Sequence, residues 1–343
     1  MPDPNHSEGA DTGRRRPSPA AWREELRTAI RSAQTLCEAL GLTREAADAA
    51  IADPGDFPVL VPRSYVARMR HGDARDPLLM QVLARDIERV AVNGYVADPL
   101  HERESASAGV LRKYARRALL VTTAACPVHC RYCFRRHFPY SEHLAARDGW
   151  QSALDALRAA PDVEEVILSG GDPLTLSTAK LAELVAALET IATVTTLRVH
   201  TRFPIVVPSR VTADLQRMFD ESRLRTVIVV HCNHANELDD PAVADALHAL
   251  SRSCDLLLNQ SVLLRGVNDD VAALRELSMS LFRANVMPYY LHMLDPVAGS
   301  AHYAVSELRG RRLLGQLRAE LPGYLVPRLV REDPGALSKT PVC

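Results

Sequence analysis

The sequence predicts an α/β protein whose main part is a partial, open barrel of six βα units, preceded by an N-terminal helical extension. From about Ala118 onward, short runs rich in β-branched residues alternate with amphipathic stretches of helical period. Strands that are joined through helices pair in parallel, with right-handed crossovers. Six units favour an open barrel over the closed eight-unit form, and a doubly wound sheet is the alternative.

Each unit begins with a strand and continues into a helix. The strands are expected at Ala118–Thr123, Glu165–Ser169, Leu197–Thr201, Thr226–His231, Leu256–Gln260 and Met287–His292. The helices are expected near Trp150–Ala159, Thr178–Ile191, Thr212–Asp220, Pro241–Arg252, Asp270–Ala284 and Val305–Leu321.

The region before the barrel carries no catalytic constellation. Apolar residues recur at helical spacing through much of Pro19–Leu100, with one helix expected over Trp22–Leu40 and a second capped by Thr43. The polar first residues contain an Arg-Arg-Arg-Pro run and no apolar signal segment. We therefore divide the chain into a disordered tail (1–20), a helical region (21–105), the barrel (106–330) and a C-terminal segment (331–343).

The composition is that of an ordinary globular protein. The chain has 343 residues, of which 47% are hydrophobic and 24% charged, and its net charge is -1. Such a charge argues against a large nucleic-acid surface. No apolar run reaches the roughly 18 residues that a membrane span needs. We expect a cytoplasmic protein, because a reducing compartment suits its seven cysteines.

Three cysteines in one short run are the most specific feature of the sequence. Cys126, Cys130 and Cys133 have the spacing C-x3-C-x2-C. Three thiolates at this spacing can hold three irons of a [4Fe-4S] cluster and leave the fourth iron open. An open iron can chelate S-adenosylmethionine, which one electron then cleaves to a carbon radical. The spacing therefore predicts radical chemistry and a reducing electron donor.

Two other interpretations of these cysteines are weaker. Zinc usually takes four ligands in paired motifs, and no second pair follows, although His129 could supply a fourth ligand. Three clustered thiols cannot all form disulfides with one another.

The predicted strands end in polar residues, as expected at the functional rim of a parallel barrel. The second strand ends in Ser169, Gly170, Gly171 and Asp172, a turn whose glycines let the backbone approach a ligand. After a three-cysteine loop, this turn suits the methionine end of S-adenosylmethionine. Lys339 lies among Pro and Gly residues near the C-terminus and could form a Schiff base with pyridoxal 5'-phosphate.

Several motifs occur in an order that resembles the lysine 2,3-aminomutase family of radical S-adenosylmethionine enzymes. They are the cysteine loop Cys126–Arg136, Ser-Gly-Gly-Asp-Pro from Ser169, Asn-Gln-Ser-Val-Leu-Leu-Arg-Gly-Val-Asn-Asp from Asn259, Met-Pro-Tyr-Tyr-Leu-His from Met287 and Ser-Lys-Thr-Pro from Ser338. The resemblance runs from about residue 60 to the C-terminus. Val-Pro-Arg-Ser-Tyr from Val61 and Gly-Tyr-Leu-Val-Pro from Gly323 are most similar to the short bacterial branch that makes β-lysine for elongation factor P.

The resemblance implies roles for individual residues. Cys126, Cys130 and Cys133 match the cluster ligands, and Lys339 matches the lysine that holds pyridoxal phosphate. The remaining implied contacts are Lys113, Tyr114 and Arg117 to pyridoxal phosphate; Ser169, Gly170, Gly171, Asp172, His231 and Gln260 to S-adenosylmethionine; Arg135 to the substrate carboxylate; and Asp295 and Glu332 to the substrate ammonium, with Asp333 as a rival to Glu332.

The implied activity is the isomerisation of L-α-lysine to β-lysine, with an indirect link to elongation factor P and its lysine ligase. The chain stops at Cys343, so we expect no zinc site of the kind carried by the C-terminal tail of longer relatives. The oligomeric state stays open. The alternatives are an aminomutase for another amino acid such as glutamate, a radical enzyme without pyridoxal phosphate, and a non-enzymatic metal protein.

Overall fold

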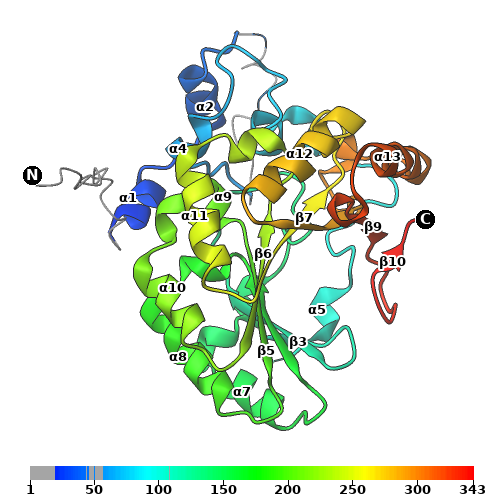
Figure 1. The fold of residues 1–343 in the computed structure, drawn as a ribbon. Helices are drawn as coiled ribbons and strands as arrows, with labels where there is room; N and C mark the ends of the chain where they lie inside the picture. Colours follow the sequence, from blue (N-terminus) through cyan, green and yellow to red (C-terminus); the bar gives the residue numbers. More distant parts are fainter. Residues whose placement is uncertain (1–19, 44, 46–49, 51–56, 108) are drawn as a thin grey trace, which may run out of the picture.

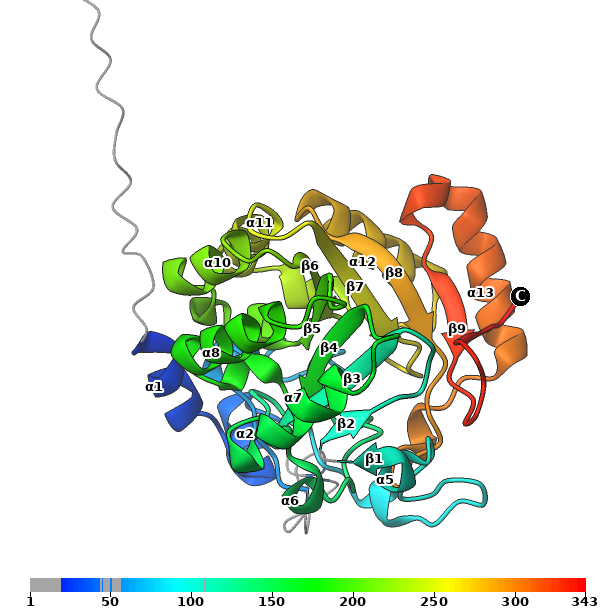
Figure 2. The same ribbon diagram turned by 90° about the horizontal axis from the view of Figure 1, so that it is seen from below.

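The strands form one sheet whose spatial order is the order of the sequence. The computed structural model describes residues 20–43, 45, 50, 57–107 and 109–343. Strands β1 to β10 are neighbours in turn, and every pairing from β3 to β9 is parallel. A doubly wound sheet would reverse its strand order at a switch point. The prediction of an open parallel barrel is therefore confirmed, and Figure 2 shows the strands as an arc.

The sheet is longer than the six predicted strands. Its strands are β1 (Ala106–Ser107), β2 (Val110–Leu111), β3 (Arg117–Thr123), β4 (Glu165–Gly170), β5 (Thr196–Thr201), β6 (Arg225–His231), β7 (Leu256–Val262), β8 (Met287–His292), β9 (Arg328–Arg331) and β10 (Thr340–Pro341). The six predicted strands correspond to β3–β8, with ends within two residues. The two strands missed at the C-terminus, β9 and β10, are too short to show a period in the sequence.

Helices cover the outer side of the arc (Figures 1 and 2). The main ones are α7 (Gln151–Arg158), α8 (Thr178–Glu189), α10 (Ala213–Asp220), α11 (Pro241–Ser251), α12 (Val271–Arg283) and α13 (Glu307–Glu320). Side-chain N-caps stabilise α8, α10, α11, α12 and α13. Each begins after a Ser, Thr or Asp whose side chain accepts a hydrogen bond from a backbone N–H of the first turn. Helix α8 buries Leu181, Leu184 and Leu188 on one face, which is the spacing expected of a helix packed on a sheet.

Short helices occupy several of the remaining connections. They are α5 (Glu102–Ser105), α6 (Tyr140–His143) and α9 (Phe203–Val206), with 3-10 turns η3 (Ala145–Asp148), η4 (Pro173–Thr175), η5 (Pro208–Arg210), η6 (Ala235–Leu238), η7 (Ala301–Tyr303) and η8 (Gly323–Leu325). None of the helices in the described ranges combines the length and the apolar character that crossing a bilayer requires.

The described part of the N-terminal region is less helical than predicted. The expected helix over Trp22–Leu40 is two short helices, α1 (Ala21–Arg27) and α2 (Ala33–Ala39), because the backbone at Ile30 leaves the helix to pair with Val61. Among the described residues further along lie the short helices α4 (Arg63–Val66) and α5, with the 3-10 turns η1 (Leu79–Gln81) and η2 (Asp86–Arg89). The predicted tail, except Ala20, and most of the helix expected after Thr43 fall outside the described residues.

This region instead packs on the loop that carries the three cysteines. The backbone N–H of His129 donates to the carbonyl of Leu60 at 3.0 Å, and that of Arg131 donates to Gln81 at 2.9 Å. The Arg131 guanidinium also pairs with Glu88 at 2.6 Å, and both side chains are almost fully buried. The residues before the barrel therefore fix the position of the cysteine loop.

Candidate active site

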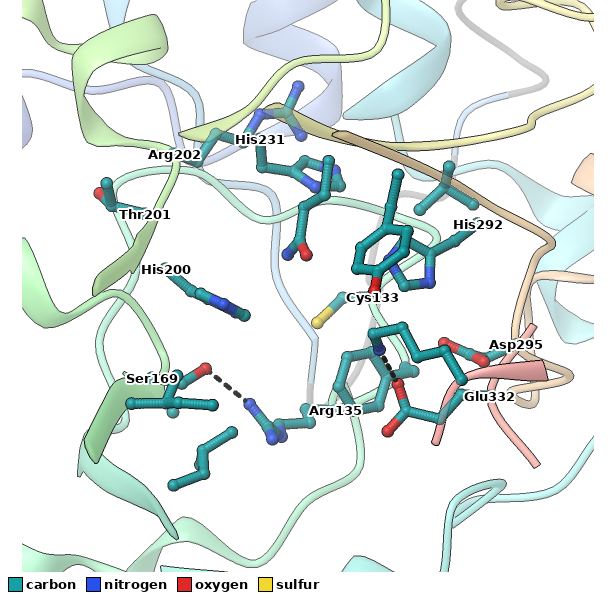
Figure 3. Close-up of a pocket in the computed structure, with 18 of the residues that line it drawn as sticks. Cys133, Arg135, Ser169, His200, Thr201, Arg202, His231, His292, Asp295 and Glu332 are labelled. Atoms are coloured by element: carbon teal, nitrogen blue, oxygen red, sulfur yellow. Dashed lines mark hydrogen bonds and ion pairs between the residues drawn. The ribbon is translucent and has the colours of Figure 1, made fainter. Parts of the chain in front are cut away.

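One cavity of about 550 Å³ lies at the carboxyl ends of the strands. The ends of β4 to β9 all contribute lining residues, as expected of a parallel barrel. All sixteen residues predicted as site residues line it: Lys113, Tyr114, Arg117, Cys126, Cys130, Cys133, Arg135, Ser169, Gly170, Gly171, Asp172, His231, Gln260, Asp295, Glu332 and Lys339. Figure 3 shows several of them converging on the same space. Asp333, the rival of Glu332, does not line the cavity.

The cysteine loop forms one wall of this cavity. Cys126, Cys130 and Cys133 are free thiols that line it together. Burial and the neighbouring cysteines raise the pKa of Cys126 and raise that of Cys133 to about 11. Among the described residues, no three His, Cys, Asp or Glu side chains converge tightly enough to bind a single metal ion. A four-iron cluster takes one thiolate on each of three irons, so its three cysteines need not meet at a single metal ion. Three thiols that line one cavity fit such a cluster.

The turn after β4 packs directly against the cysteine loop. Gly171 donates to the carbonyl of Thr123 at 2.6 Å, and Asp172 donates to that of Ala125 at 2.8 Å. A Cβ atom at Gly171 would lie 2.3 Å from the Ala125 oxygen, so only glycine fits. Gly170 has a φ of +118°, which also favours glycine. The two glycines thus have a packing reason in addition to any contact with a ligand.

The Asp172 carboxylate is held by the protein itself. It accepts hydrogen bonds from the Thr201 hydroxyl at 2.8 Å and from the Arg202 backbone N–H at 2.6 Å. Burial raises the pKa of Asp172 to about 6 despite these donors. This carboxylate therefore ties the end of β4 to the end of β5.

The opposite wall is built by the hairpin of β9 and β10. Thr340 pairs with Arg331 in antiparallel register, so the residues just inside the turn, Glu332 and Lys339, face each other. The Lys339 ammonium forms an ion pair with Glu332 and lies 5.9 Å from the centre of the Tyr290 ring. Asp333 instead pairs with Arg331 at 2.9 Å and accepts from the Thr340 hydroxyl at 2.6 Å. The register selects Glu332, not Asp333, as the acid of the cavity.

Alternating charges connect the two walls. Glu102 accepts from Arg135 Nε at 2.6 Å and from Nη2 at 2.8 Å, and it pairs with Lys113 at 2.8 Å. Lys113 pairs in turn with Glu332 at 2.9 Å, and Glu332 with Lys339. The series Arg135, Glu102, Lys113, Glu332, Lys339 thus alternates cation and anion.

Burial opposes ionisation of both acids in this series, but the paired cations outweigh it. Arg135 and Lys113 lower the pKa of Glu102, and Lys339 and Lys113 lower that of Glu332. The pKa of Tyr114 is raised by burial and by the charge of Glu332. Arg117 stacks over the Tyr114 ring at 5.3 Å. These groups form a polar pocket in which an anion would meet Lys113 and Arg117.

Asp295 differs from the two acids of the series. It lies just beyond β8, and its carboxylate reaches the cavity near Glu332 (Figure 3). Burial and the negative charge of Glu332 raise the pKa of Asp295 to about 7. The carboxyl therefore changes charge near neutral pH, and an incoming cation would favour its ionised form.

The last two predicted residues come from the centre of the sheet. His231 ends β6, and its Nε2 lies 2.8 Å from the Tyr132 hydroxyl. Burial lowers the pKa of His231 to about 3, so the imidazole is neutral. Gln260, in the neighbouring β7, is paired in register with His231 and lines the cavity.

Two functional neighbours were missed by sequence reasoning alone. Glu102 lies in a short helix of the region that the sequence predicts as scaffold, and no motif marks it. Arg202 belongs to a polar strand end, but its partners come from segments far apart in the chain. Both are defined by contacts that only the fold creates.

Comparisons with known proteins agree with this geometry. A family model described as "4Fe-4S single cluster domain" matches residues 115–203, which include the cysteine loop. The chain is 48% identical to the L-lysine 2,3-aminomutase of Escherichia coli over 286 residues, which are 83% of each protein. It is 42% identical to that of Haemophilus influenzae, covering 93% of this chain and 94% of the relative. With the enzyme of Clostridium subterminale it shares 32% identity, over 94% of this chain and 77% of the relative.

Solved structures resemble the fold more distantly. Streptococcus suis SuiB bound to the precursor peptide SuiA matches with a TM-score of 0.45 and 14% identity, over 66% of this chain and 50% of that one. A radical SAM methyltransferase from Sphaerobacter thermophilus matches with a TM-score of 0.45 and 17% identity, over 65% and 68%. The sequence relatives are much closer, and on their identity and coverage this chain belongs to the L-lysine 2,3-aminomutase family.

Proposed function

We propose that this protein is a radical S-adenosylmethionine isomerase that converts L-α-lysine to β-lysine. The observation that carries the proposal is the meeting of three cysteines and Lys339 in one cavity that Arg135, Asp295 and Glu332 also line. The relatives named L-lysine 2,3-aminomutase support the substrate. When bound, the cluster with S-adenosylmethionine supplies a carbon radical, and pyridoxal phosphate supplies an electron sink for the migrating amino group.

At the cysteine wall, Cys126, Cys130 and Cys133 hold the [4Fe-4S] cluster. The turn Ser169–Asp172, together with His231 and Gln260, surrounds the space next to it and contacts S-adenosylmethionine. His231 is neutral and anchored by Tyr132, so its ring is available as an oriented dipole and adds no charge. The packed glycines keep the turn rigid against the cysteine loop.

At the opposite wall, Lys339 would hold pyridoxal phosphate covalently through its side-chain nitrogen, which is the role of such a lysine in enzymes that use this cofactor. Lys113 and Arg117 bind the phosphate, and Tyr114 lies beside them. Lys113 is already held by Glu102 and Glu332, so its position is set before the anion arrives. The alternating charges thus pre-organise this end of the cavity, which lowers the entropic cost of binding.

Arg135, Asp295 and Glu332 select the substrate. Glu102 occupies Nε and Nη2 of Arg135, whereas Nη1 donates to the Ser169 hydroxyl at 3.0 Å. The substrate carboxylate is expected at Nη1. Glu332 already holds an ε-ammonium, that of Lys339, which supports its role as acceptor for the ε-ammonium of lysine.

The wider role follows from the resemblance to the short bacterial branch. The product β-lysine is expected to pass to a lysine ligase that modifies elongation factor P, and a low-potential reductant supplies the electron. We place the reaction in the cytoplasm. We also keep the division into an N-terminal region (21–105), a barrel (106–330) and a cofactor-lysine segment (331–343).

An anaerobic assay tests the proposal. Protein reconstituted with iron, sulfide and pyridoxal phosphate is incubated with dithionite, S-adenosylmethionine and either L-lysine or L-glutamate. We expect 5'-deoxyadenosine and β-lysine with lysine, and no β-amino acid with glutamate. β-Glutamate as the main product would show that glutamate, not lysine, is the substrate. 5'-Deoxyadenosine without either β-amino acid would refute the aminomutase activity.

A further inference from the structure

Arg202 follows β5 and directs a buried guanidinium at one of the three cysteines. Its side chain is 6% exposed. Nη1 lies 2.7 Å from Cys130 Sγ and 2.6 Å from the Tyr132 hydroxyl. A charge-assisted hydrogen bond of this kind is about twice as strong as a neutral one. Figure 3 shows Arg202 beside His231 at the edge of the pocket.

The other end of the guanidinium is fixed by several partners. Nη2 donates to the Tyr65 hydroxyl at 3.0 Å, to Gln81 Oε1 at 2.8 Å and to Glu237 Oε2 at 2.8 Å. Tyr65 and Gln81 belong to the N-terminal region, and Glu237 lies in η6. The position of Nη1 against the sulfur is therefore set by residues from three separate parts of the chain.

Glu237 bonds to Nη2 of the guanidinium, whereas the sulfur bonds to Nη1. Its side chain is 0% exposed, and its Oε1 accepts the backbone N–H groups of Asn233 at 2.9 Å and His234 at 3.1 Å. It also accepts from Gln81 Nε2 at 3.1 Å. The Arg202 cation thus contacts Cys130 and is paired with the Glu237 anion. Both charges are buried, where charges interact more strongly than in water.

We propose that Arg202 is a positioning residue that orients Cys130 and raises the reduction potential of the iron–sulfur cluster, and that Glu237 limits the size of this effect. The inference rests on the proposed function, because it takes Cys130 as a cluster ligand. Reduction adds one electron, supplied by a low-potential donor, and so adds negative charge to the cluster and its thiolates. Hydrogen bonds to the sulfurs and nearby charge set the potential of such clusters. A guanidinium against the sulfur stabilises the reduced form, whereas the carboxylate opposes it.

The two residues should therefore shift the potential in opposite directions. The test is a redox titration of the reconstituted protein with dithionite under argon, followed by electron paramagnetic resonance. Arg202→Gln should lower the equilibrium constant for one-electron reduction of the cluster about tenfold, which corresponds to a reduction potential about 59 mV more negative. Glu237→Gln should make the potential less negative. Arg202→Lys keeps the positive charge but loses the planar guanidinium, so its shift in reduction potential should be smaller than that of Arg202→Gln.

A merely structural role for the pair predicts a different pattern. Loss of either partner would then loosen the loop and lower iron content without opposite shifts of potential. Arg210→Gln is the matched control, because Arg210 is 0% exposed and bonds to the Leu174 carbonyl at 2.7 Å, with no cysteine among its hydrogen-bond acceptors. Its potential should equal that of the unmodified protein, and iron and sulfide content is measured for every variant.

The outcomes separate this inference from the proposed function. If the unmodified protein takes up no cluster, the proposed cluster site fails and the inference fails with it. If it takes up the cluster and the potentials of Arg202→Gln and Glu237→Gln do not move in opposite directions, the inference alone is overturned. If Arg202→Gln does not retain a cluster, the decision rests on Glu237→Gln, whose less negative potential supports the inference and whose unchanged potential refutes it.

Discussion

The two walls of the cavity are built in different ways. The cysteine wall comes from one contiguous loop, Cys126–Cys133, clamped by the N-terminal region. The lysine wall brings together Lys113, Asp295, Glu332 and Lys339 from segments far apart in the chain. A contiguous loop carries its chemistry in its spacing, whereas a composite wall depends on strand order and register. The cysteine site is therefore visible in the sequence, whereas the lysine site forms only when the fold brings its residues together.

The walls also differ in their electrostatics. Burial raises the pKa of Cys126 and Cys133, so their thiols are protonated until a metal binds. At the lysine wall, each acid of the alternating series is already ionised beside a cation. One wall therefore needs its cofactor to become charged, and the other is charged before its cofactor arrives.

The largest effect is expected from breaking the cysteine wall alone. Cys133→Ala should abolish cluster binding and all turnover, since three thiolates are the minimum for this cluster. Pyridoxal phosphate should still attach to Lys339, because that wall shares no ligand with the cysteines. Iron analysis and mass mapping of the borohydride-fixed pyridoxyl group would measure both. Cys254→Ala is the control, because Cys254 does not line the cavity, and retention of iron by Cys133→Ala would contradict the assignment.

The reciprocal change breaks the lysine wall alone. Lys339→Ala should keep full iron content and the ability to cleave S-adenosylmethionine slowly, but form no β-lysine, because the cofactor loses its covalent attachment. The readouts are iron content, 5'-deoxyadenosine and β-lysine from the same sample. Near-normal turnover of this variant with added pyridoxal phosphate would remove Lys339 from its proposed role.

The same contrast explains what the sequence could predict. The six strands of the barrel core and the cysteine loop were predicted because period and spacing are local properties. Asp333 stayed a rival to Glu332 because the two are adjacent in the sequence. Their contacts separate them: Glu332 pairs with Lys113 and Lys339, whereas Asp333 pairs with Arg331. Glu102 was missed because its role consists of contacts with Arg135 and Lys113. The helix expected over Trp22–Leu40 is divided in two because pairing of Ile30 with Val61 overrides local helical spacing.

A smaller effect, on the free energy of unfolding, is expected at Glu102, which links the two walls through Arg135 and Lys113. Glu102→Gln leaves Arg135 and Lys113 without their shared buried anion, and breaking a buried pair in this way typically costs about 3–5 kcal/mol. Urea unfolding of the apo protein would measure the loss. Asp162→Asn breaks the exposed pair with Arg112 and should cost less than about 1 kcal/mol. Equal effects of the two changes would show that the series adds no stability.

The smallest expected effect is a pH dependence at Asp295. Burial and the charge of Glu332 raise its pKa to about 7, so the carboxyl is neutral below that pH and ionised above it. In the proposed function, the lysine ammonium binds the ionised carboxylate. The KM for lysine should therefore fall as pH rises through about 7 and should increase by up to about tenfold per pH unit below it.

The midpoint of this dependence is also set by Lys339, in the same wall as Asp295. The ammonium of Lys339 lowers the pKa of Asp295, so attachment of Lys339 to the cofactor removes a cation and should move the midpoint to higher pH. Asp295→Asn should flatten the profile, whereas Asp333→Asn, outside the cavity and paired with Arg331, should preserve it. A profile of KM against pH that is the same in Asp295→Asn and the unmodified protein would show that another group controls lysine binding.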